Sequence, residues 1–371
     1  MSIFFIIGFI IILFFIVFSG IYSIRYYDFK EIFFKILAIK YGIKKVVYIK
    51  NINQNSLDLI NKVFQLEIKG KFIEYNIATP AWKPILSLES VDGNQWKIIK
   101  NNFIYFISKF NKNLHYLENN IKDYTNRYII TNVIIDSKII SLITLKSFCK
   151  YLFNIEISDI ESETLYLGSL EWRKEIALKG KGNMEIKNNC IQILLNLIKL
   201  NQNIYSIFNE NWSKPEYYSV IAQPFIISPM INVSDIMSNT QILLSNSLIL
   251  ASDEVNTFLI DKIIYSYHPF PILERYDPKT STQYFIPLDS LTNFNNFNEK
   301  TRKIVFGSGV RKCAGQNYVY VIIKNLLILY FNNKEKFNPM LNHKYSGRNN
   351  DNFNFQEILY MGKILFKLII S

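Results

Sequence analysis

The chain has 371 residues, of which 49% are hydrophobic, so it is long and apolar enough for one large folded domain or two small ones. Its formal net charge of +12 suits nucleic acid, an anionic membrane surface or an acidic protein partner, but no nucleic-acid-binding motif accompanies it. The odd number of cysteines, Cys149, Cys190 and Cys313, argues against a disulfide framework, and the sequence holds no zinc signature.

The first segment of the chain is strongly apolar. Residues 1–24 carry no charge, and Ile3 to Tyr22 is long enough for a helix that spans a bilayer. A cleaved signal peptide is the alternative, but it requires a basic start, which Met1 and its neighbours do not provide. Basic residues dominate the segment that follows, and the positive-inside rule then predicts a single-pass anchor with residues 25–371 in the cytoplasm. In a eukaryotic or viral source this corresponds to the endoplasmic-reticulum type of membrane protein.

The next elements are short strands and a helix, and longer helices follow. Lys45 to Ile52 reads as a strand, Ser56 is placed to cap a helix that runs through Gln65, and Lys71 to Ile77 alternates as a second strand. Apolar residues three and four apart predict three further helices, over Ile139–Leu152, Leu165–Lys179 and Glu185–Leu200. Three prolines, Pro215, Pro224 and Pro229, then predict a punctuated connection.

Trp96 and Lys100 form a candidate anion grip between these elements. They lie four residues apart, so a helix over this stretch puts both side chains on one face. An indole N–H and a cation placed together in this way suit a carboxylate ligand. The alternative is a core tryptophan beside a surface lysine.

A second informative stretch is the helix predicted from Ser234 to Ser252. Ser234 is placed to cap it, and Asp235 suits its first turn. Asn239 and Thr240 lie inside it, where their side chains either serve a site or bond to their own helix. The next helix, from Asn256 to Tyr267, ends before a Pro-containing turn.

The most specific stretch is the glycine-rich loop Phe306 to Gly315, followed by a helix to about Asn332. It delivers Cys313 to the start of that helix, where the helix dipole and the neighbouring cations Arg311 and Lys312 favour a thiolate. Glycines in the loop permit unusual backbone dihedrals. A buried structural cysteine is the alternative.

This loop resembles the cysteine-ligand loop of the cytochrome P450 monooxygenases, F-x-x-G-x-R-x-C-x-G, at every fixed position. Trp96 and Lys100 resemble the family's W-x-x-x-R pair, with lysine in place of arginine. Thr240 falls on the first threonine of the family's central helix, while Asn239 replaces its acid. The final part of the chain, through a β-like stretch from Ile358 to Ile370, also fits the family's ending.

The resemblance implies a mainly α fold with small β-sheets behind an N-terminal transmembrane helix. It implies haem b as cofactor, with Cys313 as the iron ligand, and it places Thr240 and Asn239 beside bound oxygen as catalytic residues. The implied cofactor-binding residues are Trp96, Lys100, Arg275, Phe306, Arg311 and Cys313. The implied reaction inserts one atom of O2 into an apolar small molecule, with electrons from an NADPH-dependent reductase or a ferredoxin.

The chain also departs from the family and resembles a divergent, shortened member. Ile263 and Ser266 stand where the family's E-x-x-R helix has its two charges, and no arginine occurs from Ser290 to Phe297. The segment between Thr240 and Cys313 is short for the family. A degenerate haem-binding protein without turnover therefore stays open as the alternative function. A cationic docking face for the electron donor is expected from four residues, Arg302, Lys303, Lys312 and Lys324.

Overall fold

The computed structural model describes residues 38–71, 74–110, 112–177, 179–245, 255–266, 268–269 and 272–345, together with Tyr360 and Lys363. The predicted anchor, residues 1–24, lies outside the described residues. So does most of the strand predicted at Ile358 to Ile370, although Tyr360 and Lys363 are helical where that strand was expected.

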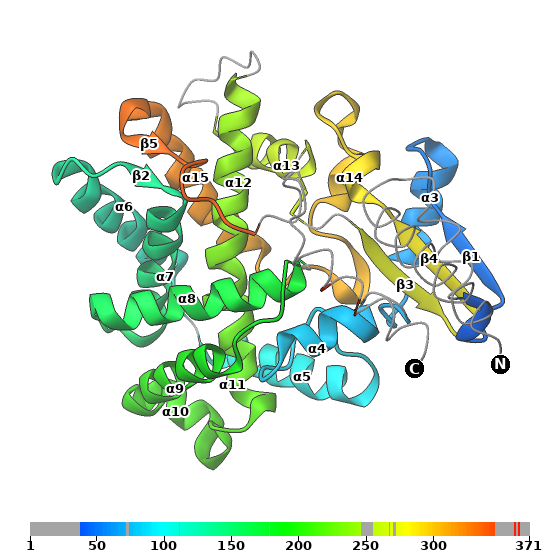
Figure 1. Ribbon diagram of the computed structural model, residues 1–371, viewed down its shortest axis with the longest axis horizontal. Helices are drawn as coiled ribbons and strands as arrows, with labels where there is room; N and C mark the ends of the chain where they lie inside the picture. The colour runs from blue at the N-terminus through cyan, green and yellow to red at the C-terminus, as the bar shows by residue number, and fades with distance from the viewer. Residues whose placement is uncertain are drawn as a thin grey trace, which may run out of the picture.

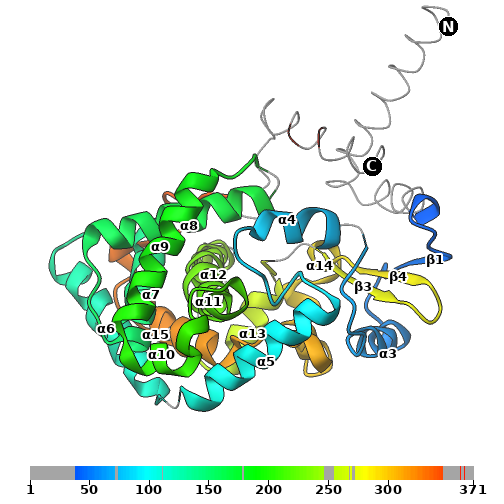
Figure 2. The same cartoon turned by 90° about the horizontal axis from the view of Figure 1, so that it is seen from below.

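Helices make up most of the described fold. Figures 1 and 2 show them gathered around α12, which runs through the middle of the molecule and is seen end-on in Figure 2. The longer ones are α5 (Gly93–Lys109), α6 (Leu114–Ile130), α7 (Ser137–Phe153), α8 (Asp159–Ile176), α9 (Met184–Leu200), α12 (Ser228–Ser245) and α15 (Gln316–Asn332). The shorter ones are α3 (Gln54–Val63), α4 (Thr79–Trp82), α10 (Gln202–Phe208), α11 (Pro215–Ile221), α13 (Thr257–Ser266) and α14 (Leu288–Leu291).

The central helix begins earlier than the sequence predicts. A π-helical segment, η3 (Ala222–Ile227), joins α11 directly to α12, so Pro224 and Pro229 lie within a continuous helical rod and not in a connection. A proline removes one backbone donor, and a π-helical turn is a common way for a helix to absorb such a defect. Ser234 is therefore inside the helix rather than its cap, and its hydroxyl lies 2.5 Å from that of Ser137 on α7.

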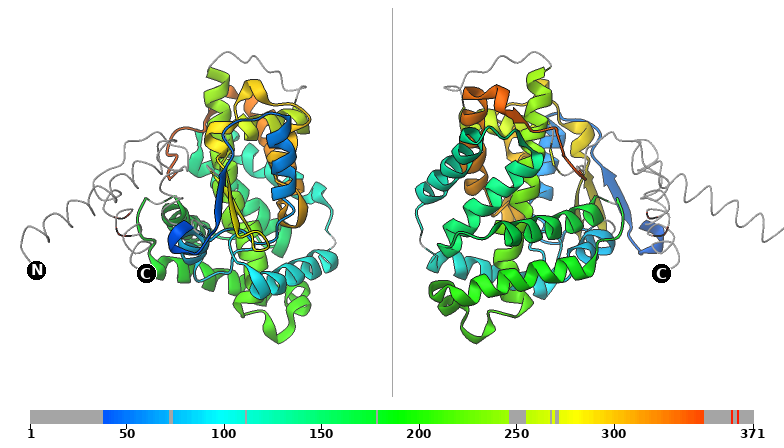
Figure 3. Two further views of the ribbon diagram at one scale, coloured as in Figure 1. Left: turned by 90° about the vertical axis from the view of Figure 1, so that its right-hand side faces the viewer. Right: turned by 60° about the vertical axis from the view of Figure 1, so that its left-hand side comes forward.

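Two small sheets accompany the helices. In the larger, β1 (Lys45–Tyr48) pairs in parallel with β4 (Thr282–Ile286), and β3 (Leu273–Asp277) pairs antiparallel with β4. Figures 1 and 3 show this sheet on one side of the molecule, away from most of the helices. The smaller sheet joins β2 (Ile135–Asp136) to β5 (Phe337–Asn338).

Two local predictions near the N-terminal side are wrong. The segment expected as a strand from Lys71 is instead π-helical at η1 (Glu74–Ala78), because alternation over so few residues does not distinguish a strand from a turn of helix. The cap of α3 is Asn53, not Ser56, and the two side chains form a reciprocal capping box. In the same way a capping box at Ser158 starts α8 earlier than the predicted Leu165. The mainly α class with small sheets is confirmed.

In the described part of the chain, one helical stretch is long and apolar enough to cross a membrane, Pro215–Leu243. An 18-residue apolar window of this stretch is 83% buried within the structure, as expected for the core helix of a folded domain.

Candidate functional site

The cysteine loop follows the 3₁₀ turn η6 (Thr301–Ile304), contains a second 3₁₀ turn, η7 (Gly309–Arg311), and ends at the start of α15. The backbone N–H of Cys313 donates to the carbonyl of Phe306 at 2.9 Å, which closes the loop on itself. Gly307 and Gly309 have φ of +67° and +71°, a region that other residues seldom adopt. A Cβ on Gly309 would also lie 2.4 Å from the carbonyl oxygen of Phe64, so glycine is required there for two reasons.

Cys313 differs from the other two cysteines in its accessibility. Cys149 and Cys190 are fully buried, while solvent reaches the side chain of Cys313. Protein atoms nevertheless crowd the Cys313 sulfur, and this burial raises the pKa of the thiol above its ordinary value. A hydrogen bond from the backbone N–H of Gly315 and the charge of Lys312 act in the opposite direction but do not outweigh the burial. Burial therefore acts against the thiolate that the sequence predicts at Cys313, while the Gly315 N–H and Lys312 favour it.

The structure brings Trp96, Lys100 and Arg311 together. Trp96 is buried on α5, with Lys100 one turn further along the same face, as the spacing predicts. The ammonium of Lys100 lies 4.5 Å and the guanidinium of Arg311 lies 4.0 Å from the centre of the indole ring. Lys100 also donates to the carbonyl oxygen of Val310 in the cysteine loop at 3.2 Å. One tryptophan thus stacks with a cation from α5 and a cation from the cysteine loop.

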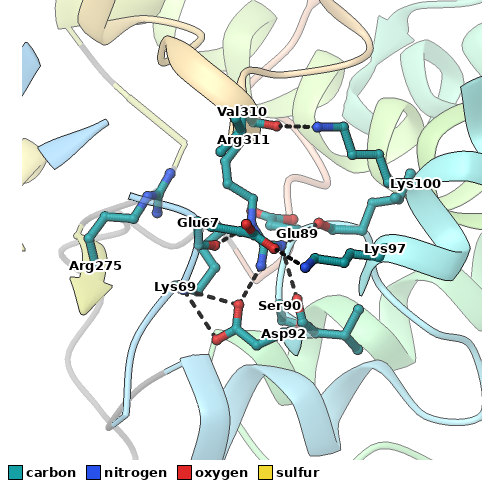
Figure 4. Close-up of polar contacts among 12 residues, drawn as sticks. Glu67, Lys69, Glu89, Ser90, Asp92, Lys97, Lys100, Arg275, Val310 and Arg311 are labelled. Carbon is teal, nitrogen blue, oxygen red and sulfur yellow. Dashed lines mark hydrogen bonds and ion pairs between the residues drawn. The ribbon is translucent and has the colours of Figure 1, made fainter. Parts of the chain in front are cut away.

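Arg311 is the most heavily bonded side chain of the loop, and only 1% of it is exposed. Its Nε donates to the carbonyl of Glu67 at 2.8 Å, and its Nη1 donates to the carbonyls of Leu88 at 3.2 Å and Val91 at 2.9 Å. Its Nη2 forms an ion pair with the carboxylate of Asp92 (Figure 4). The guanidinium therefore ties the cysteine loop to the chain just before α5.

Asp92 is a functional-site residue that the sequence reasoning missed. Besides Arg311, its two carboxylate oxygens accept from the backbone N–H of Lys69 at 3.0 and 3.1 Å. The sequence signal for Asp92 is its position just before α5. An aspartate at that position is expected to cap the helix. Here the Asp92 side chain makes no cap bond and turns to Arg311 and Lys69 instead.

Arg275 and Phe306 occupy two further sides of the region. Arg275 lies on β3, is 3% exposed, and donates from Nη1 to the carbonyl of Glu274 at 2.7 Å. Figure 4 shows its guanidinium approaching from the opposite side to Lys100. Phe306 packs edge-on against Tyr320 of α15, with ring centres 5.4 Å apart.

The two predicted catalytic residues, Asn239 and Thr240, are buried on α12. The hydroxyl of Thr240 donates to the carbonyl of Ile236, one turn earlier, at 2.8 Å. This is the local bonding that threonine makes in helix interiors.

A charged pair joins α13 to η6, just before the cysteine loop, and the sequence did not predict this pair. Asp261 of α13 is 1% exposed and pairs with Nε of Arg302 in η6 at 2.5 Å, while the Tyr320 hydroxyl donates to its other oxygen at 2.8 Å. His268 also contacts the carbonyl of Val305, just before the loop, at 2.9 Å. Ile263 and Ser266 carry no charge, as the sequence indicates, and Asp261, two residues before Ile263 on α13, supplies the buried carboxylate.

No family model matches this chain, and no curated protein matches it. Several solved structures are similar in fold. A cytochrome P450 from the archaeon Picrophilus torridus, bound to 4-phenylimidazole, has a TM-score of 0.52 and 16% identity, over 76% of this chain and 87% of that one. A cyanobacterial P450 with retinoic acid bound has a TM-score of 0.52 and 12% identity, over 77% of this chain and 82% of that one.

A mutant of P450SP alpha is also similar, with a TM-score of 0.52 and 9% identity over 76% of this chain and 81% of that one. At such low identities the likeness concerns the fold alone. The described chain therefore has the cytochrome P450 fold.

Proposed function

We propose that the protein is a haem-thiolate monooxygenase in which Cys313 binds the iron of haem b. The observation that carries the proposal is the accessible Cys313 thiol, held in a closed glycine-rich loop with the N–H of Gly315 directed at its sulfur. A cysteine thiolate is a soft donor suited to iron, and a backbone N–H aimed at the sulfur tunes such a ligand. When bound, the haem supplies the activation of O2 and its insertion into an apolar small molecule, with electrons from an NADPH-dependent reductase or a ferredoxin.

The residues around the loop fit the carboxylates of a haem in part. Trp96, Lys100 and Arg275 are cationic or donor side chains next to the loop, and we assign them to the propionates. Arg311 fits less well, because Asp92 and three carbonyls already use its guanidinium. It contributes to cofactor binding only by sharing that guanidinium with Asp92. Phe306 packs against α15 and shapes the loop.

A second candidate is a haem-binding protein without turnover, and the bonding of α12 favours it. The Thr240 hydroxyl donates to its own helix. The neighbouring Asn239 carries an amide, which does not release a proton as a carboxylic acid does. We propose Thr240 and Asn239 as the residues that face bound oxygen in the active form, and turnover with a reductase separates the two candidates.

The test of the iron ligand uses three matched cysteine variants. We expect Cys313→Ala to lose the red-shifted Soret band of the reduced, carbon monoxide-bound protein, because that band requires thiolate ligation. Cys149→Ala and Cys190→Ala remove buried thiols and should keep the band. A Cys313→Ala protein that keeps it would remove the central claim.

We also propose that residues 1–24 anchor the protein in a membrane, with residues 25–371 on the cytoplasmic side as one haem domain. The apolar, uncharged composition of that segment supports the proposal. Deleting residues 1–24 should release the protein from membranes and leave the Soret band in place. Pelleting of the shortened protein with membranes at high salt would point to another insertion site.

A further inference from the structure

A second recess lies away from the cysteine loop. It has a volume of about 740 Å³ and is lined by residues from the end of α5, the start of α6, the end of α7 and the region of α10. Figure 2 shows α6, α7 and α10 on one side of α12. No residue that lines it belongs to the cysteine loop or contacts Arg311. A cavity of this size accommodates a small organic molecule.

The charged side chains that line this recess are all basic. Lys109, Lys112 and Lys150 line it, and no aspartate or glutamate is among its described lining residues. We call it the lysine recess. In the part of the chain that the structure describes, none of the three lysines has a carboxylate within ion-pair distance. Glu156 has an electrostatic interaction with Lys150 at longer range, and it forms its ion pair with Arg127 at 3.2 Å.

Basic residues nearby behave differently. Lys122, Lys138 and Lys146 on the neighbouring helices α6 and α7 each form an ion pair, with Nζ–O distances of 2.6, 2.9 and 2.6 Å. Lysines on these helices therefore form ion pairs where a carboxylate lies within reach. The three lysines of the recess stand out because they share a cavity and have no such partner there.

Lys112 is held in place inside the recess. Its ammonium donates to the carbonyl of Tyr151 at 2.6 Å, and the Tyr151 hydroxyl donates back to the carbonyl of Lys112 at 2.9 Å. Burial and the charge of Lys150 lower the pKa of Lys112. Two like charges held near each other in a partly enclosed space are a common arrangement at anion-binding sites.

The remaining lining has two characters. Asn120, Asn203 and Ser206 provide hydrogen-bonding groups, while Phe110, Leu152 and Ile207 provide apolar surface. We propose that the lysine recess binds an organic phosphate, with its phosphate at the three lysines and its apolar part against these side chains. The phosphate group belongs either to a soluble phosphate ester or to the headgroup of a membrane lipid.

The test uses the full chain in phosphatidylcholine nanodiscs and measures acetylation of each lysine by mass spectrometry. Phenyl phosphate is the soluble probe, and phosphatidic acid added to the nanodiscs is the lipid probe. A bound phosphate should slow acetylation of Lys109, Lys112 and Lys150 in a saturable way. The exposed lysines Lys83 and Lys181 should react at an unchanged rate.

Each outcome has a definite meaning. Protection by phenyl phosphate identifies a soluble ester, and protection only with phosphatidic acid in the bilayer identifies a lipid headgroup. If neither probe protects the three lysines in a saturable way, the proposal is wrong. Equal protection by inorganic phosphate would overturn the part of the proposal that concerns the apolar surface.

A pair of charge-matched variants completes the test. Lys109→Gln combined with Lys150→Gln should weaken binding of the effective probe about tenfold or more, because charge-assisted hydrogen bonds to phosphate are lost. Lys83→Gln combined with Lys181→Gln removes the same charge elsewhere and should leave the affinity unchanged. Equal losses in the two double variants would mean that the overall charge, and not the recess, attracts the probe.

Discussion

Asp92 and Arg311 form a charged pair whose two members depend on each other. The Arg311 side chain is almost completely buried, and it forms an ion pair with Asp92. A buried guanidinium that loses its counterion keeps the full cost of its desolvation. The pair therefore stabilises the contact between the cysteine loop and the start of α5 in one specific arrangement.

We expect Asp92→Asn to lower the free energy of unfolding by about 3 kcal/mol, because it removes the carboxylate charge that pairs with the buried Arg311 guanidinium. Denaturant-induced unfolding measures the effect. Asp159→Asn is the matched control, because it breaks the ion pair between Asp159 and Lys146, in which the Asp159 side chain is 96% exposed. That change should cost about 1 kcal/mol or less. Equal losses in the two variants would show that Arg311 does not need Asp92.

The raised pKa of Cys313 gives the second prediction at this scale. The thiolate reacts with iodoacetamide and the thiol does not, so a raised pKa keeps the reaction slow at neutral pH. The alkylation rate of Cys313 should increase with pH, with a midpoint above the value of about 8.5 for a free cysteine. Peptide mass spectrometry separates Cys313 from the buried Cys149 and Cys190. A midpoint below that value would mean that the helix dipole and the charge of Lys312 outweigh burial.

At the scale of elements, α13 and η6 are joined by Asp261 and Arg302 beneath the cysteine loop. Burial raises the pKa of Asp261, although the hydrogen bonds from Tyr320 and Arg302 act to lower it. An acid whose pKa is raised in the folded state favours folding least when it is ionised. Asp261 therefore lowers the free energy of unfolding as pH rises from its unfolded-state pKa to its higher folded-state pKa.

We expect Arg302→Gln to destabilise the protein at neutral pH by about 3 kcal/mol, since Asp261 stays buried without its cation. Lowering the pH should recover part of the loss, because protonation removes the unpaired charge. The double variant Asp261→Asn with Arg302→Gln should be more stable than Arg302→Gln alone. Chemical unfolding of the two variants at two pH values decides the matter, and additive losses would argue against coupling.

The elements show which features a sequence can predict. Periodicity and caps predict α7, α9, α13 and α15 well, because these helices repeat a simple apolar pattern. The start of α12 was predicted wrongly, since proline normally breaks a helix and the π-helical turn at η3 cannot be read from local composition. Asp92 and Asp261 were missed for a different reason. Their partners lie far away in the sequence, and pairs of that kind depend on the tertiary fold.

At the scale of the whole molecule, the cationic residues near the loop divide into two groups. Lys303, Lys312 and Lys324 are exposed, whereas Arg302 is committed to Asp261. We propose that the exposed lysines steer an acidic electron donor toward the cysteine loop. Lys312 also influences the pKa of Cys313, so it is a poor choice for a test of docking alone.

We therefore choose Lys303→Glu combined with Lys324→Glu. Reversing these charges should slow the first electron transfer from an acidic reductase and flatten its dependence on salt, because electrostatic steering is screened by ions. Stopped-flow reduction measures the rate, and the ferric spectrum should not change. Lys83→Glu combined with Lys181→Glu is the control. A wild-type rate and salt dependence in the first variant would place the docking face elsewhere.

The position of Trp96 beside the cysteine loop has an optical consequence. An excited indole transfers its energy efficiently to a visible absorber within a few nanometres, and Trp96 lies against the loop that carries Cys313. If haem binds at that loop, the emission of this residue should fall in proportion to the loaded fraction. The difference between the emission of the wild type and that of Trp96→Phe isolates its share from those of Trp82, Trp172 and Trp212. The residue thus provides an internal gauge of cofactor loading that requires neither turnover nor a redox partner.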